Sequence, residues 1–336
     1  MDGNRTKWDG VLVVDSGDLF HNVVTLTDSI RPQVFARAES YLSIFEGMGH
    51  TAQGIGDRDL ALGLGKLRDL AKRAKFPFLN ANIVDAVTGK AVFQERVIVE
   101  RAGVKIGLFG LLTPSYRLRA QQEKRDGFRV EDPIVAARAQ VEALRGEGAE
   151  VLVLLSHLTL EESALLAQKV PGITAILGSQ SQQMKRYPDA VETTYIADAY
   201  IKGKYLSALT LFVRNDETKF VFADPSRKTS VESRIREIET RVKAREKAIA
   251  AAKEAEKGGT PGKGTEWLQR NLEQSRTELT ALQSEHSGLS DVDIRDASFI
   301  AYDFPPMAKT VKDKSEVVAQ LDKLKVEFPA LAKPGR

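Results

Sequence analysis

The first part of the chain alternates short apolar runs with segments of helical spacing, and this alternation most narrows the folds open to it. Residues 151–155 (Val-Leu-Val-Leu-Leu) are an uninterrupted apolar run, typical of a strand covered on both faces. Residues 34–48 instead place Phe35, Leu42 and Phe45 on one helical stripe. Apolar strands that alternate with helices predict a layered α/β fold, a sandwich of sheets flanked by helices.

The same two patterns predict the other elements up to about Val213. Strands are expected at residues 11–14, 77–82, 92–99, 104–112, 174–177, 193–197 and 207–213, with 92–99 and 104–112 forming a hairpin. Helices are expected at residues 60–74, 133–145 and 161–168.

Beyond this region the chain becomes charged and alanine-rich. Two heptad stripes joined by a Gly/Pro-rich turn at 257–264 predict an antiparallel helical hairpin, a coiled coil. A structural arm and a protein-binding surface are both open readings of it. A strand at 299–304 and an amphipathic helix at 316–328 follow. The predicted domains are 1–213 (α/β), 214–230 (linker), 231–289 (hairpin) and 290–336 (strand and helix).

Composition excludes several classes of function. The 336 residues carry 49 basic and 46 acidic side chains, and a net charge of +3 gives no reason to expect nucleic-acid binding. There is no cysteine, so disulfides and thiolate metal sites are excluded. No apolar run reaches the roughly 18 residues of a membrane-spanning helix. Residues 1–8 lack the apolar region of a signal peptide.

Two aspartates follow predicted buried strands. Asp18 lies in a Gly-Asp pair after residues 11–14, and Asp57 lies in the loop before residues 60–74. Carboxylates at the ends of strands can enter a cleft and hold divalent metal ions. Each also has a structural reading, Asp18 as a turn residue and Asp57 as a helix N-cap.

Two further polar segments follow predicted strands. His157 comes directly after residues 151–155, where a metal ligand or a hydrogen-bonded structural histidine would both be expected. Residues 178–182 (Gly-Ser-Gln-Ser-Gln) follow the run 173–177 and read, taken alone, as a polar turn. They carry two glutamines, Gln180 and Gln182.

Taken in order, these segments resemble the calcineurin-like metallophosphoesterases, and most of all their 5′-nucleotidase branch. Three segments outside the metal-ligand motifs carry the resemblance more distinctively than the motifs do. They are residues 77–82 (Pro-Phe-Leu-Asn-Ala-Asn), residues 103–113 (Gly-Val-Lys-Ile-Gly-Leu-Phe-Gly-Leu-Leu-Thr) and residues 171–178 after His157. The resemblance covers about residues 8–213 and does not extend through the helical hairpin. It implies two divalent metals about 3.5–4 Å apart, bridged by an aspartate.

The resemblance transfers unevenly to this chain. Asp18 matches the bridging aspartate, and His157 matches a histidine ligand. The family's Gly-Asn-His-Glu stands here as residues 56–59 (Gly-Asp-Arg-Asp), so the asparagine ligand becomes Asp57 and the catalytic histidine becomes Arg58. The family's first motif, Asp-X-His, has no counterpart.

The last family motif, Gly-His-X-His, matches residues 178–182 with Gln180 and Gln182 in place of both histidines. Amide oxygens are weaker ligands than imidazoles. The sequence therefore predicts a divalent metal (Mg²⁺, Mn²⁺, Ca²⁺ or Zn²⁺) that is weakly bound or absent. It also predicts that Arg58 binds an anion as a fixed cation rather than delivering a proton.

Two interpretations of the α/β part follow. One is a catalytically impaired phosphatase-fold protein, a pseudo-phosphatase with a binding or scaffold role. The alternative is a metal-dependent phosphoester hydrolase with a rearranged, single-metal site at Asp18, Asp57 and His157. Family members are usually exported, so a start upstream of Met1 would be expected to add a signal peptide and the missing motif. Even then, Arg58, Gln180 and Gln182 would differ from the family pattern.

Overall fold

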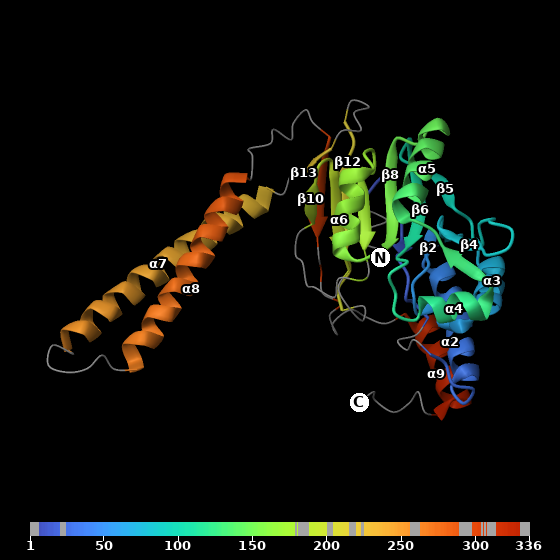
Figure 1. Cartoon of the computed structure of the whole chain (residues 1–336), viewed down its shortest axis with the longest axis horizontal. Coiled ribbons are helices and arrows are strands. Elements are labelled where there is room, and N and C mark those ends of the chain that lie inside the picture. Colours follow the sequence, from blue (N-terminus) through green and yellow to red (C-terminus); the bar gives the residue numbers. More distant parts are fainter. Residues whose placement is uncertain are drawn as a thin grey trace. The chain divides into compact units, whose positions relative to one another are not determined.

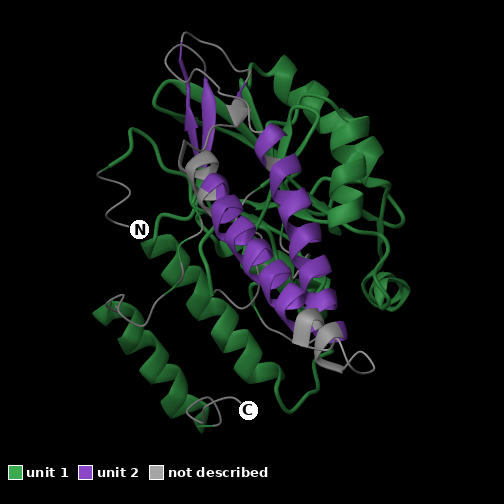
Figure 2. Cartoon of the chain, turned by 90° about the vertical axis from the view of Figure 1, so that its left-hand side faces the viewer, with its two compact units in different colours: residues 1–209, 302–336 green, residues 210–301 purple. Residues whose placement is uncertain are grey.

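The structure, a computed structural model, describes residues 7–20, 25–178, 180, 188–199, 204–214, 220–222, 225–255, 263–288, 298–303, 305, 307 and 314–329. The chain divides into two compact units (Figure 2). The first comprises residues 1–209 and 302–336, and the second comprises residues 210–301.

A six-stranded sheet forms the centre of the first unit, in the order β10-β11-β9-β8-β6-β5 (Figure 1). Neighbouring strands from β11 to β6 run parallel, and the two edge strands run antiparallel. Its strands are β5 (Arg96–Arg101), β6 (Val104–Leu112), β8 (Val151–His157), β9 (Ala175–Gly178), β10 (Asp189–Val191) and β11 (Thr194–Asp198). The parallel register brings the carboxyl ends of β6, β8, β9 and β11 to one edge of the sheet.

A second, smaller sheet of three parallel strands lies in the order β1-β2-β3. Its strands are β1 (Val14–Asp15), β2 (Ala52–Gly54) and β3 (Phe78–Leu79), and a separate antiparallel pair joins β4 (Ile83–Asp85) to β7 (Phe128–Val130). Two hydrogen bonds join this sheet to the six-stranded sheet near the ends of their strands. The Ser16 hydroxyl donates to the Leu177 carbonyl at 2.6 Å, and the Ala81 amide donates to the Gly110 carbonyl at 2.8 Å.

Helices cover these sheets. Those of the first unit are α2 (Arg31–Gly47), the 3-10 helix η1 (Asp59–Leu62), α3 (Leu64–Arg73), α4 (Arg119–Asp126), α5 (Pro133–Gly146), α6 (Leu160–Lys169) and α9 (Ser315–Glu327). Helix α5 lies against β5 and β6, and α6 lies against β9 to β11. Asp132 caps the start of α5, because its carboxylate accepts from the backbone amides of Ile134 and Val135. Pro133 occupies the first turn of this helix.

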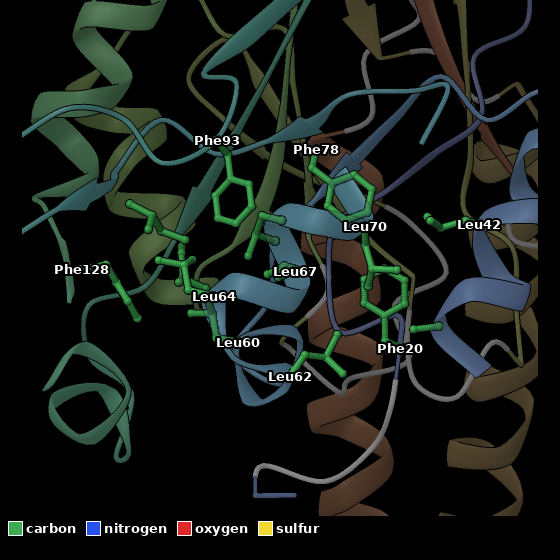
Figure 3. Close-up of a cluster of buried hydrophobic side chains, with 14 of the residues drawn as sticks. Phe20, Leu42, Leu60, Leu62, Leu64, Leu67, Leu70, Phe78, Phe93 and Phe128 are labelled. Carbon is green, nitrogen blue, oxygen red and sulfur yellow. The ribbon is translucent and has the colours of Figure 1, made fainter. Parts of the chain in front are cut away.

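Buried apolar side chains fill the space between α2, α3 and the β1-β2-β3 sheet (Figure 3). Phe20, from the loop after β1, stacks with Phe78 of β3 at a centroid distance of 6.0 Å. Leu60 and Leu62 of η1 enter the same cluster. The loop before η1 is therefore anchored on both sides by the core, which fixes the backbone that carries residues 56–59.

The second unit contains two long helices, α7 (Pro225–Ala255) and α8 (Lys263–Gly288). They pair antiparallel, because Glu232 of α7 contacts His286 near the end of α8, whereas Arg245, further along α7, contacts Asn271 nearer the start of α8. A coiled-coil geometry for this pair stays a prediction. Strands β12 (Ala208–Phe212), β14 (Phe299–Asp303) and β13 (Val221–Phe222) form a small sheet in that order.

Most predicted elements are present, with some differences. The helix predicted at 60–74 is broken by Gly63, whose φ of 85° lies in the left-handed region, into η1 and α3. The strand predicted at 11–14 is reduced to β1. Elements α4, β2, β4, β7, β10 and β13 were not predicted, because they are short or polar. No helix within the described ranges is long and apolar enough to span a membrane.

Candidate functional site

The loops that follow β1 and β2 lie against each other, and glycines make this approach possible. A Cβ on Gly17, whose φ is 112°, would lie 2.5 Å from the backbone nitrogen of Gly56. A Cβ on Gly56 would meet the backbone nitrogen and carboxylate of Asp18. The two loops that carry the predicted aspartates are thus in backbone contact.

Asp59 holds these two loops together from inside. Its fully buried carboxylate accepts from the amides of Asp18 and Gly56 at 2.8 and 2.9 Å. Asp18 itself has a φ of 63°, a left-handed conformation that aspartate tolerates better than most residues. The Asp59 contact fixes this conformation, and with it the direction of the Asp18 side chain.

The Asp18 carboxylate faces Arg58 and His157. One oxygen accepts from the Arg58 amide at 2.7 Å and lies 3.5 Å from His157 Nε2. The other lies 3.1 Å from the Arg58 guanidinium, whose side chain is 37% exposed. Arg58 therefore contacts this carboxylate through both its backbone and its side chain.

Asp57 is more deeply buried, at 4% exposure, and both of its oxygens are occupied. Oδ1 forms an ion pair with Arg119, whose side chain is 6% exposed. Oδ2 accepts from the Gln180 amide at 2.8 Å and lies 3.6 Å from His157 Nε2. Asp57 does not cap the following helix, because its side chain turns instead towards Arg119 and Gln180.

His157 lies at the carboxyl end of β8 and is almost fully buried. A capping box formed by Thr159 and Glu162 begins α6 two residues later, which ends the strand at this point. Glu162 also accepts from the Thr113 hydroxyl at 2.8 Å, which joins the end of β6 to the first turn of α6. These contacts place the imidazole between Asp18 and Asp57.

Burial raises the pKa of three carboxyl groups in this region, those of Asp57, Asp59 and Asp15. It raises the pKa of Asp57, and His157 and Arg119 offset this only in part. Burial and then the nearby Asp18 carboxylate raise the pKa of Asp59 well above its usual value. Burial also raises the pKa of Asp15, whose carboxylate accepts from Gly17 and Gln53.

The donor set does not fit the two-metal centre that this fold family implies. The oxygens of Asp57 already accept from Arg119 and Gln180, and those of Asp18 accept from Arg58. Gln180 donates to Asp57 through its amide nitrogen. An amide nitrogen of this kind is a donor and does not bind metal ions. In the part of the chain that the structure describes, no three His, Asp or Glu side chains are arranged to hold a metal ion.

The structure brings five of the predicted site residues together: Asp18, Asp57, Arg58, His157 and Gln180. Gln182 lies outside the described residues. The roles of all these predicted site residues in metal or anion binding stay predictions.

Sequence reasoning missed Arg119 and Gln122. Arg119 donates to Gln122 and to the Thr113 carbonyl, both at 2.9 Å, in addition to its ion pair with Asp57. Gln122 donates to the main-chain carbonyl of Asp57 at 2.9 Å. Helix α4, which carries both, is too polar to show an apolar stripe. The one available signal was an arginine soon after the end of the β6 run.

Comparison with solved structures supports the architecture. The calcineurin-like phosphoesterase YfkN of Bacillus subtilis matches with a TM-score of 0.55 and 21% identity, over 64% of this chain and 76% of that chain. The 5′-nucleotidase precursor of Thermus thermophilus matches with a TM-score of 0.52 and 22% identity, over 65% and 45%. These likenesses establish the fold. The chain therefore has the fold of the calcineurin-like phosphoesterases, and its sequence is similar to that of a 5′-nucleotidase.

Curated relatives fall in the nucleotidase branch. The 5′-nucleotidase of Vibrio cholerae is 27% identical over 210 residues, 53% of this chain and 38% of the relative. A 2′,3′-cyclic-nucleotide 2′-phosphodiesterase/3′-nucleotidase of Haemophilus influenzae is 25% identical over 199 residues, 54% and 30%. No family model matches the chain. The chain spans less than half the length of these relatives.

Proposed function

We propose that this chain is a metallophosphoesterase-fold protein with a catalytically impaired site and a binding or scaffold role. The observation that carries the proposal is the state of Asp57, whose two oxygens are engaged by Arg119 and Gln180. A metal ion at Asp57 would therefore have to compete with both of these side chains for the carboxylate oxygens. Arg58 stands where the resemblance implies a catalytic histidine, and a guanidinium does not release a proton at neutral pH.

The proposal is tested by assaying purified protein against phosphomonoesters, phosphodiesters and 5′-nucleotides, each with Mn²⁺, Zn²⁺, Mg²⁺ or Ca²⁺. We expect no hydrolysis that depends on Asp18 or His157. Asp18→Ala and His157→Ala are therefore expected to match the unmodified protein in every assay. Asp28→Ala, whose side chain is 98% exposed, controls for the loss of a carboxylate elsewhere. A phosphatase rate that Asp18→Ala and His157→Ala abolish, and Asp28→Ala does not, contradicts the proposal.

One observation favours a second candidate, a phosphoester hydrolase with a single hard metal. His157 Nε2 lies 3.5 Å from Asp18 and 3.6 Å from Asp57, so three side chains of the predicted ligand set converge. A hard cation such as Mg²⁺ could use the two carboxylates. This candidate requires Asp57 to exchange its Arg119 and Gln180 contacts for metal, and it predicts stoichiometric metal retention.

Arg58 is the proposed anion-binding residue of the impaired site. Its guanidinium is partly exposed but is paired with Asp18 at 3.1 Å, so we expect phosphate or carboxylate to bind weakly. Calorimetric titration with inorganic phosphate tests this, with Arg58→Ala expected to remove the binding. Arg129→Ala is the matched control, because Arg129 is similarly exposed and similarly paired with Glu131. Equal binding by both variants would exclude Arg58 as the anion site.

The helix pair α7 and α8 is the proposed surface for a protein partner. Trp267 of α8 is exposed, which supports this role because exposed tryptophans are frequent anchors in protein interfaces. If deletion of residues 231–289 leaves the capture of a partner unchanged, the helix pair is not the binding surface.

A further inference from the structure

Asp57 is clamped by one turn of α4, through both its side chain and its backbone. Arg119 pairs with its carboxylate, while Gln122 donates to its main-chain carbonyl at 2.9 Å. Arg119 and Gln122 are themselves joined at 2.9 Å, and Arg119 is held to the Thr113 carbonyl. The guanidinium is thus a fixed part of the site and not a surface group that happens to reach it.

Each of the two carboxylates has its own arginine. Arg58 pairs with Asp18, and Arg119 pairs with Asp57. A buried carboxylate without a compensating charge is strongly unfavourable. In the fold family the metal ions provide this compensation, whereas here it comes from side chains of the chain itself.

We propose that Arg119 is an internal counter-ion that takes the place of a metal ion at Asp57. This inference rests on the proposed function, in which the site does not work through bound metal. The guanidinium supplies a positive charge beside Asp57, so this carboxylate has a counter-ion without any metal. A divalent cation at Asp57 would have to displace a guanidinium that is only 6% exposed and hydrogen-bonded to the backbone.

The inference predicts that removing the guanidinium creates a response to metal. Arg119→Met is expected to have a lower melting temperature than the unmodified protein, because Asp57 loses its counter-ion. Mn²⁺ is expected to raise the melting temperature of Arg119→Met and to leave that of the unmodified protein unchanged. A purely structural arginine would give the first effect but not the second.

Two controls isolate Asp57. The double variant Arg119→Met/Asp57→Asn removes both charges, so it is expected to melt higher than Arg119→Met without metal and to show no Mn²⁺ response. Arg125→Met removes another arginine of α4, which is paired with Asp126 and not with Asp57. Its melting temperature is expected to be insensitive to Mn²⁺.

The outcomes separate this inference from the proposed function. If Arg119→Met folds and shows no Mn²⁺ response, the counter-ion inference is overturned while the proposed function stands. If Mn²⁺ raises the melting temperature of the unmodified protein and Asp57→Asn abolishes the effect, both are overturned.

A further comparison applies if Arg119→Met does not fold. Asp57→Asn alone leaves Arg119 buried without its carboxylate and is expected to melt lower than the unmodified protein. Adding Arg119→Met to Asp57→Asn is expected to restore part of that loss. If the double variant melts no higher than Asp57→Asn, Arg119 is not the counter-ion of Asp57.

Discussion

The contact between the two loops of the site requires glycine at position 56. Any side chain there would meet the backbone nitrogen and the carboxylate of Asp18, so the two loops could not keep their contact. Gly65, in α3, has nothing within 4 Å of the equivalent position. A substitution by alanine at Gly65 therefore serves as the control for the same substitution at Gly56, because only Gly56 lacks space for a Cβ.

Gly56→Ala is expected to destabilise the protein by about 1–3 kcal/mol, the usual cost of forcing extra atoms into a packed site. Gly65→Ala is expected to stabilise it by roughly 0.5–1 kcal/mol, because alanine favours a helix over glycine. Urea unfolding of both variants measures these changes. Equal effects of the two substitutions would show that the loop contact at Gly56 is not tight.

His50 is a buried histidine away from the site. Its ring lies between Phe45 and Phe76, with centroid distances of 4.6 and 4.7 Å, and it is 8% exposed. Neither ring nitrogen has a hydrogen-bond partner of good geometry among the described residues, although the neighbouring Gln53 and Ala52 offset part of the effect of burial on the pKa of His50. Burial lowers the pKa of His50 from 6.5 to about 4.

This shift makes stability depend on pH. Between pH 6.5 and about 4 the unfolded chain binds a proton at His50 that the folded protein does not, so stability falls as the pH falls through this window. From pH 7 to pH 5 the loss due to His50 is on the order of 2 kcal/mol.

His50→Phe removes this contribution and should reduce the loss of stability between pH 7 and pH 5 by the same amount. Urea unfolding of both proteins at the two pH values measures it. Buried carboxyls such as Asp57 titrate in both proteins and cancel in the comparison. An unchanged pH dependence in His50→Phe would show that His50 does not remain neutral in the folded protein.

At the scale of elements, the α7–α8 pair contains a polar contact within its apolar seam. Arg245 of α7 donates to the Ser275 hydroxyl and to the Asn271 carbonyl of α8. Ser275 is almost fully buried, and Ile238 and Ile249 are buried on the same helix as Arg245. A polar contact at one level of an apolar seam can fix the register of two helices.

Arg245→Ala is expected to destabilise the helix pair by about 1.5–3 kcal/mol, the range for hydrogen bonds to a charged group. Arg234→Ala removes an exposed arginine from the same helix, and its solvent-screened ion pair with Glu278 should contribute much less. Hydrogen exchange of α7 and α8 in the full chain measures both. Equal protection in the two variants would contradict a special role for Arg245.

The predictable parts of the fold and the site were those set by local pattern. Asp18 and His157 were placed correctly at strand ends, because an apolar run followed by a polar residue marks the end of a buried strand. Arg119 was not predictable in this way. Its helix is held by tertiary contacts, such as the Arg125 hydrogen bond to the Leu60 carbonyl, that leave no periodic signal in the sequence.

In the molecule as a whole, polar side chains from the strand ends of both sheets meet at one place. The β1-β2-β3 sheet brings Asp18 and Asp57, and the six-stranded sheet brings His157 and Gln180. The fold therefore brings these four side chains together at one place. What differs from the family pattern is the chemistry of the side chains, in which arginines stand against both carboxylates.

Because Arg58 and Arg119 pair with the two aspartates, we expect this site not to retain metal. The most direct measurement is elemental analysis of purified protein after incubation with Mn²⁺, Zn²⁺, Mg²⁺ and Ca²⁺ and desalting. The account predicts no metal retained above that of Asp18→Ala and His157→Ala. Near-stoichiometric metal that both substitutions abolish would contradict it and would favour the single-metal hydrolase.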